Sequence, residues 1–134
     1  MERLKIVVRY ADGRTVKGGT QDFFPNKPQF HLLPAAAGPS DEAMMVLVKE
    51  LKAVFFVRDF DGNPQYQEQK RFAEGGHHSG RKVEVTFVDG EVLVGSTMGY
   101  DPQRPGFFLF PADPETNNLR VFVVSAAVSK ISNL

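Results

Sequence analysis

The feature that most constrains the fold of this chain is an internal repeat. Residues 5–34 align without a gap to residues 82–111, an offset of 82 − 5 = 77 positions, and 11 of the 30 aligned pairs are identical. Unrelated segments of ordinary composition would share roughly two. Chance similarity between strand-rich stretches is the alternative, but several identical pairs are residues that constrain the backbone: Gly13/Gly90, Gly18/Gly95, Pro25/Pro102, Pro28/Pro105 and Pro34/Pro111. The chain is therefore expected to contain two copies of one small fold.

The repeat divides the chain into three expected parts. A first repeat covers residues 1–57, a polar linker covers 58–81, and a second repeat covers 82–134. The linker contains turn-forming pairs such as Asp61-Gly62 and Gly75-Gly76. Phe60, Tyr66 and Phe72 within it predict that parts of the linker lie against the folded repeats.

Each repeat has the pattern of five short strands. Val83, Val85 and Phe87 alternate with polar residues, as in a half-buried strand, and Asp89-Gly90 is a strong hairpin signal. Gly95, like its counterpart Gly18, is expected at a bend or bulge of the second strand. The other strands are expected at 107–110, 120–124 and 128–131, after a helical turn at 125–127, and in the first repeat at 5–11, 14–21, 29–33, 44–48 and 51–57. The predicted fold is all-β, with two tandem five-stranded small barrels from an internal duplication.

Two strands of the second repeat are apolar on both faces. In 107–110 and 121–124, both the odd-numbered and the even-numbered side chains are apolar, whereas a solitary small barrel would have one wet face. The candidate interaction surface consists of the expected outward-facing residues Phe108, Phe110, Phe122 and Val124. We expect the other repeat, the linker aromatics or a second chain to cover it.

The second repeat resembles a known fold. The run Asp89-Gly90-Glu91-Val92-Leu93-Val94-Gly95, the segment from Pro105 to Pro114 and the pair Asn117-Asn118 resemble the Sm-like fold, and in particular an uncharacterised bacterial Sm-like domain family. The resemblance implies that the two barrels are tandem Sm-like domains. It implies no activity, because that family has no established one.

The resemblance also suggests an alternative function. RNA-binding Sm proteins use the loop after strand two and an Arg-Gly loop between strands four and five. The first of these loops corresponds to 99–104 and 22–27, where the candidate ligand residues are Phe23, Phe24, Lys27, Tyr100 and Arg104. Neither 124–126 nor 48–50 contains Arg-Gly. Binding of RNA or a nucleotide is therefore the disfavoured alternative, and the loop aromatics are expected to pack on the barrel rim.

Composition excludes several other classes of function. Lys and Arg total 16 and Asp and Glu total 16, so the net charge is zero and no excess of positive charge attracts phosphates. The absence of cysteine excludes disulfides, thiolate metal sites and a cysteine nucleophile. His77-His78 could contribute to a metal site only with further ligands, and a flexible linker is the alternative interpretation. No catalytic base can be identified, so we expect neither a cofactor nor enzymatic activity.

The sequence thus predicts a non-catalytic module for self-association or for binding a protein partner, with bacterial signalling as a suggested setting. The uncovered edges of the fourth and fifth strands are the natural contacts, because an added strand satisfies their backbone groups. No apolar run approaches the roughly 20 residues needed to span a bilayer, so we expect no membrane partner. No secretion signal is recognised at the start of the sequence, and a cytoplasmic location is expected.

Overall fold

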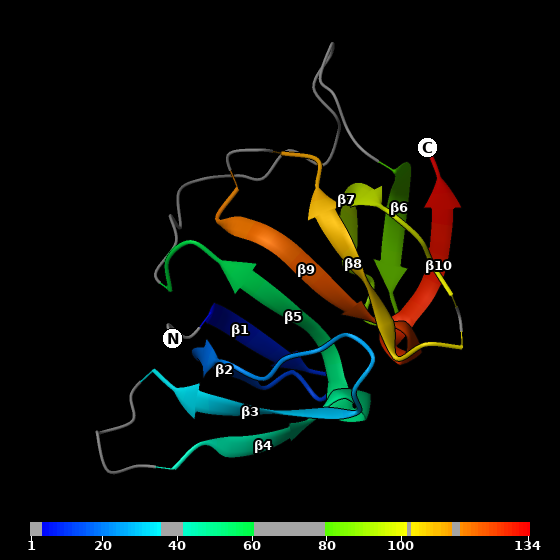
Figure 1. Cartoon of the computed structure of the whole chain (residues 1–134). Helices are drawn as coiled ribbons and strands as arrows, with labels where there is room; N and C mark the ends of the chain where they lie inside the picture. Colours follow the sequence, from blue (N-terminus) through cyan, green and yellow to red (C-terminus); the bar gives the residue numbers. More distant parts are fainter. Residues whose placement is uncertain (1–3, 36–41, 61–79, 102, 114–115) are drawn as a thin grey trace.

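Ten short strands form one antiparallel sheet in the computed structural model (Figure 1). The structure describes residues 4–35, 42–60, 80–101, 103–113 and 116–134. The strands of the first half are β1 (Leu4–Tyr10), β2 (Thr15–Thr20), β3 (Gln29–Pro34), β4 (Met44–Leu47) and β5 (Leu51–Val57). Those of the second half are β6 (Arg81–Phe87), β7 (Val92–Thr97), β8 (Gly106–Pro111), β9 (Asn118–Val124) and β10 (Val128–Asn133).

The two halves have the same arrangement of elements. A single 3₁₀ turn precedes the last strand of each, η1 (Val48–Glu50) before β5 and η2 (Ser125–Ala127) before β10. The sheet order is β10-β6-β7-β8-β9-β5-β1-β2-β3-β4, so each half follows the order fifth, first, second, third, fourth. The all-β class and the single turn before each last strand are confirmed.

The halves are joined by β5 and β9, which pair antiparallel over Ala53↔Val123, Val54↔Phe122 and Phe55↔Val121. This joint bears on the expectation of two tandem five-stranded small barrels, which the structure does not confirm because the sheet is not closed. Among the described strands, no ladder pairs β4 with β5 or β9 with β10, and the sheet ends at β4 and β10. The physical reason is competition for edges, because β5 already pairs with β1 and β9, and β9 already pairs with β8 and β5.

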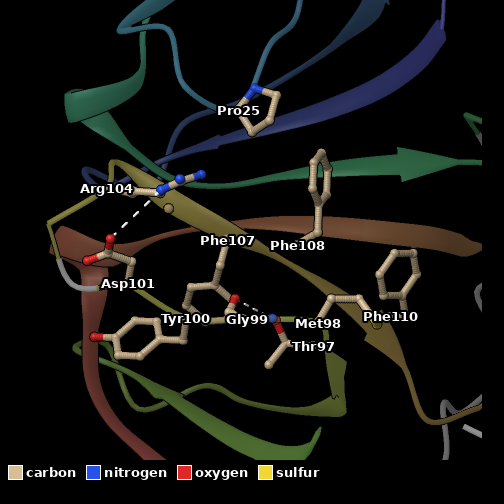
Figure 2. A pocket seen from close by; sticks show the side chains of 11 residues that line it. Pro25, Thr97, Met98, Gly99, Tyr100, Asp101, Arg104, Phe107, Phe108 and Phe110 are labelled. Atoms are coloured by element: carbon tan, nitrogen blue, oxygen red, sulfur yellow. Dashed lines mark hydrogen bonds and ion pairs between the residues drawn. The ribbon is translucent and has the colours of Figure 1, made fainter. Parts of the chain in front are cut away.

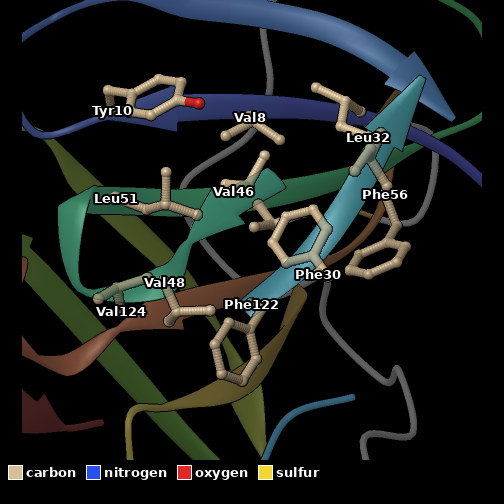
Figure 3. Packing of buried hydrophobic residues seen from close by; sticks show 12 residues of the cluster. Val8, Tyr10, Phe30, Leu32, Val46, Val48, Leu51, Phe56, Phe122 and Val124 are labelled. Atoms are coloured by element: carbon tan, nitrogen blue, oxygen red, sulfur yellow. The ribbon is translucent and has the colours of Figure 1, made fainter. Parts of the chain in front are cut away.

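Buried side chains form two hydrophobic clusters, one in each half. The alternation of β5 sends Val54 and Phe56 into the first cluster and Ala53, Phe55 and Val57 into the second. The strand β9 is shared in the same way, with one alternate set of side chains in each cluster. Figure 3 shows Phe122 and Val124 among the residues of the first cluster. Both faces of these two strands are apolar because each face belongs to a different core.

The two predicted hairpins are confirmed. Gly13 and Gly90 have positive φ angles of 99° and 94°, which a residue without Cβ adopts at little cost. The preceding aspartates accept backbone hydrogen bonds within their own turns, from Arg14 to Asp12 at 3.0 Å and from Glu91 to Asp89 at 3.0 Å.

A bend or a bulge was predicted at Gly18 and Gly95. The bulge is wrong, because the strand register runs through both residues without a shift, and the bend stays a prediction. These positions exclude a side chain for another reason. A Cβ added to Gly95 would overlap the carbonyl oxygen of Phe110, and one added to Gly18 would overlap that of Leu33. The glycines therefore allow close approach of the neighbouring strand.

Candidate interaction surfaces

The sheet has two uncovered edges, one at each end. Strand β4 pairs only with β3, and β10 pairs only with β6, among the described strands. Met45 of β4 is 55% exposed, and Val128 and Ile131 of β10 are only partly buried against the second core. Each edge therefore combines unpaired backbone groups with apolar side chains, which is the chemistry that binds an added strand.

The candidate interaction surface predicted from the sequence lies largely at the joint between the halves. Phe122 and Val124 are buried in the first core, and Phe108 packs against it. These three side chains are covered by the first half of the same chain. Phe110 differs, because it is 40% exposed.

A buried lysine adds an electrostatic contact across the joint. Lys52 of β5 is 8% exposed, and its Nζ donates hydrogen bonds to Asp89 at 2.7 Å and to Glu91 of the second half. The same ammonium lies 4.8 Å from the ring centroid of Phe87. Hydrogen bonding from Lys52, with a further bond from the backbone N–H of Glu91, lowers the pKa of Asp89. The sequence pattern assigns Asp89 only to its own turn and does not predict this contact, since Lys52 and Asp89 are 37 positions apart.

The candidate ligand residues of the first half have different environments. Phe23 lies in an aromatic cluster, with ring centroids 5.1 Å from Phe30, 5.3 Å from Phe56 and 5.1 Å from Phe122. It packs on the core, as expected for a rim anchor. Phe24 is 49% exposed, and the Nζ of Lys27 lies 4.7 Å from its ring centroid.

The candidate ligand residues of the second half line a groove of about 560 Å³ (Figure 2). Tyr100 and Arg104 meet Phe108, Phe110 and Pro25 there, so the loop of the first half lies beside the loop of the second. Tyr100 packs edge-on against Phe107 at 5.1 Å between ring centroids. The Nε of Arg104 lies 3.9 Å from a carboxylate oxygen of Asp101. The groove thus offers aromatic surface and one cation already facing a carboxylate.

An aspartate–histidine pair lies at a separate cavity of about 210 Å³. Asp22 accepts a hydrogen bond from the backbone N–H of His31 at 2.8 Å, and its other oxygen lies 2.7 Å from the His31 Nδ1. Partial burial acts to raise the pKa of Asp22, but hydrogen bonds from His31 and Thr20 outweigh it, so the pKa is lowered. This pair was not predicted from the sequence, although a signal was present. Asp22 follows β2 and His31 lies in β3, and a strand–loop–strand connection brings its two ends together.

The described residues contain no group of three side chains suited to hold a metal ion. His77 and His78 lie outside the described residues. None of the helices in the described part of the chain has the length and apolarity needed to span a bilayer.

These features define a class of protein, an all-β chain whose two repeated halves share one sheet, with its two end strands unpaired on their outer side within the described part of the chain. The chain belongs to the family of unknown function DUF6982, whose family model matches residues 2–134. No curated protein and no solved structure matches the chain.

Proposed function

We propose that this chain is a non-catalytic protein-association module that binds through the uncovered edges of its sheet. The observation that carries the proposal is the joint of β5 and β9, in which two strand edges join two folded halves by strand pairing. The same kind of edge is uncovered at β4 and at β10. Burial of unpaired backbone groups and apolar side chains such as Met45 favours association.

The proposal includes an Sm-like fold for each half. It is supported by the identical strand order of the two halves and by a separate hydrophobic cluster in each. A bacterial origin, a cytoplasmic location and a role in signalling accompany that resemblance and are proposed with it.

The second candidate function is binding of single-stranded RNA or a nucleotide in the 560 Å³ groove. The observation in its favour is that Pro25 of one loop and Tyr100 and Arg104 of the other line the same groove. Three observations favour protein association instead. Phe23 packs on the core, Asp101 faces Arg104, and the net charge of the chain is zero.

Sedimentation velocity and an RNA titration distinguish the two functions. If the chain is an association module and its partner is another copy, its mass rises above 14.9 kDa with concentration and changes little with salt. If the partner is a different protein, the mass stays at 14.9 kDa. A fluorescent single-stranded oligouridine, titrated at low salt, then shows no specific binding. The contrary result is tight RNA binding that weakens steeply with salt and falls in Lys27→Ala and Arg104→Ala, but not in Lys5→Ala, an exposed cation of β1 outside all of these loops.

A further inference from the structure

We propose that the partner at the uncovered edges is a second copy of this chain, with β4 of one copy paired to β10 of the next. The inference rests on the proposed association function and adds the identity of the partner and the geometry of the contact. It follows from the internal repeat, from the burial of corresponding strands, and from the strand register of the joint inside the chain.

The uncovered edges are the repeat counterparts of the edges that already pair. Subtracting the offset of 77 from residues 121–124 of β9 gives 44–47, which is β4. Adding 77 to residues 51–56 of β5 gives 128–133, which is β10. Among the described strands, β5 and β9 thus form this joint inside the chain. Their repeat counterparts, β10 and β4, lie at the two ends of the sheet.

Residues of β10 and β4 are more exposed than their repeat counterparts in β5 and β9, as expected if β10 and β4 lack a partner strand. All seven residues of β5 are buried, whereas β10 contains no buried residue. Phe122 of β9 is fully buried, whereas its counterpart Met45 is 55% exposed. The second core therefore lacks, beside β10, the strand that covers the first core beside β5.

The offset also predicts the register of the contact. The internal pair Val54↔Phe122 corresponds to Ile131 of one copy opposite Met45 of the next, since 54 + 77 = 131 and 122 − 77 = 45. The adjacent pair Ala53↔Val123 corresponds in the same way to Lys130 opposite Val46. Met45 would then pack beside Ile131 at the edge of the second core.

The contact between copies is expected to be weaker than the internal joint. Ser132 and Asn133 of β10 stand where β5 has Phe55 and Phe56, so less apolar surface is buried. Ser129 stands where β5 has Lys52, so the ion pair to the turn of the neighbouring half is not repeated. Assembly is therefore reversible and depends on protein concentration.

The contact is head-to-tail, since β4 and β10 are different surfaces. Each joint formed between two copies leaves one β4 and one β10 uncovered. Such heterologous contacts build an open chain of copies, or a ring when the rotation between neighbours closes.

Engineered cysteines test the pairing and its direction, because the chain contains no native cysteine. Met45→Cys and Ile131→Cys are prepared separately, mixed and oxidised, with circular dichroism confirming the fold of each. The proposal predicts a disulfide-linked dimer in the mixture and far less in either variant alone. Met98→Cys, at an apolar position that is 73% exposed and outside both edges, serves as the matched control and forms no specific cross-link with either variant.

A second variant tests the contact without a cross-linking reaction. Met45→Asp is expected to return the assembled chain to 14.9 kDa, whereas the matched Met98→Asp leaves assembly unchanged. Cross-linking of Met45→Cys mainly with itself would overturn the head-to-tail contact and leave edge association intact. A wild-type chain that stays at 14.9 kDa at every concentration would overturn the second copy as partner, and a different protein at these edges would remain.

Discussion

Lys52 shows how a single residue can link the two halves of this molecule. Its stem lies at the buried joint, while its ammonium reaches two carboxylates of the second half, Asp89 and Glu91. The carboxylates remain in contact with solvent, so the lysine satisfies its charge without burying an acid. Its repeat counterpart is Ser129, which carries no charge, so the second repeat cannot form the same ion pair.

We predict that Lys52→Met raises the pKa of Asp89 toward its ordinary value of 3.8, because the largest cause of the lowered pKa is removed. A carboxyl whose pKa is lowered on folding stabilises the protein above its unfolded pKa, and this contribution is lost as pH falls through the folded value. Wild-type stability should therefore fall as pH drops below 3.8, less steeply in Lys52→Met. Carboxyl titration by NMR checks the pKa directly. An unchanged Asp89 pKa in Lys52→Met, matching the exposed control Lys49→Met, would contradict the prediction.

Gly95 illustrates a constraint of space. We predict that Gly95→Ala lowers the free energy of unfolding by about 1–3 kcal/mol, because the new methyl group meets the backbone of β8 and one strand must shift. Gly99→Ala is the matched control, since a Cβ at that position meets nothing within 4 Å. Denaturant unfolding measures both. Equal stability of the two variants would show that the strands separate freely at Gly95.

At the scale of the elements, the joint of β5 and β9 determines how the halves are combined. Its side chains alternate between two cores, so each strand contributes to the packing of both halves. Apolar residues on both faces of 121–124 indicate that something covers this strand. The sequence does not specify which strand supplies that cover, because each fourth strand has two candidate partners, the fifth strand of its own half and that of the other.

The strands, hairpins and repeat of the fold were predictable because they depend on local alternation, on turn residues and on matched positions. The open sheet was not, since it depends on competition between equivalent edges. Of the candidate site residues, Phe122 and Val124 turned out to pack inside the chain, while Tyr100 and Arg104 share a groove with the loop of the other half. The pair of Asp22 and His31 escaped notice because neither residue is identical to its repeat counterpart, which is Gly99 for Asp22 and Phe108 for His31.

The joint makes a clear prediction for two residues of the candidate interaction surface. Phe122→Ala should lower the free energy of unfolding by about 3–5 kcal/mol, because a fully buried aromatic side chain is removed from the first core. Phe110→Ala is the matched control and should cost about 1 kcal/mol or less, since that side chain is 40% exposed. Denaturant titration compares them. A small effect at Phe122 would mean that the halves do not depend on this contact.

At the scale of the whole molecule, one continuous sheet and two shared strands predict cooperative unfolding of both halves. Differential scanning calorimetry of dilute protein should show one transition, with equal calorimetric and van't Hoff enthalpies. The physical reason is that loss of either half exposes the side chains of β5 or β9 that it covers. Two separate transitions would show that each half folds independently of the joint.

The central claim is that β5 and β9 pair inside the chain, whereas their repeat counterparts, β10 and β4, pair between copies of the chain. Hydrogen exchange of backbone amides, measured over a range of protein concentrations, tests it most directly. We predict that β5 and β9 are protected at every concentration, whereas amides at the uncovered edges of β4 and β10 are unprotected in dilute protein and gain protection together as concentration rises. Exchange at β4 and β10 that does not respond to concentration, or a gain at one edge alone, would contradict the head-to-tail account. Rapid exchange at β5 and β9 would contradict the internal joint itself.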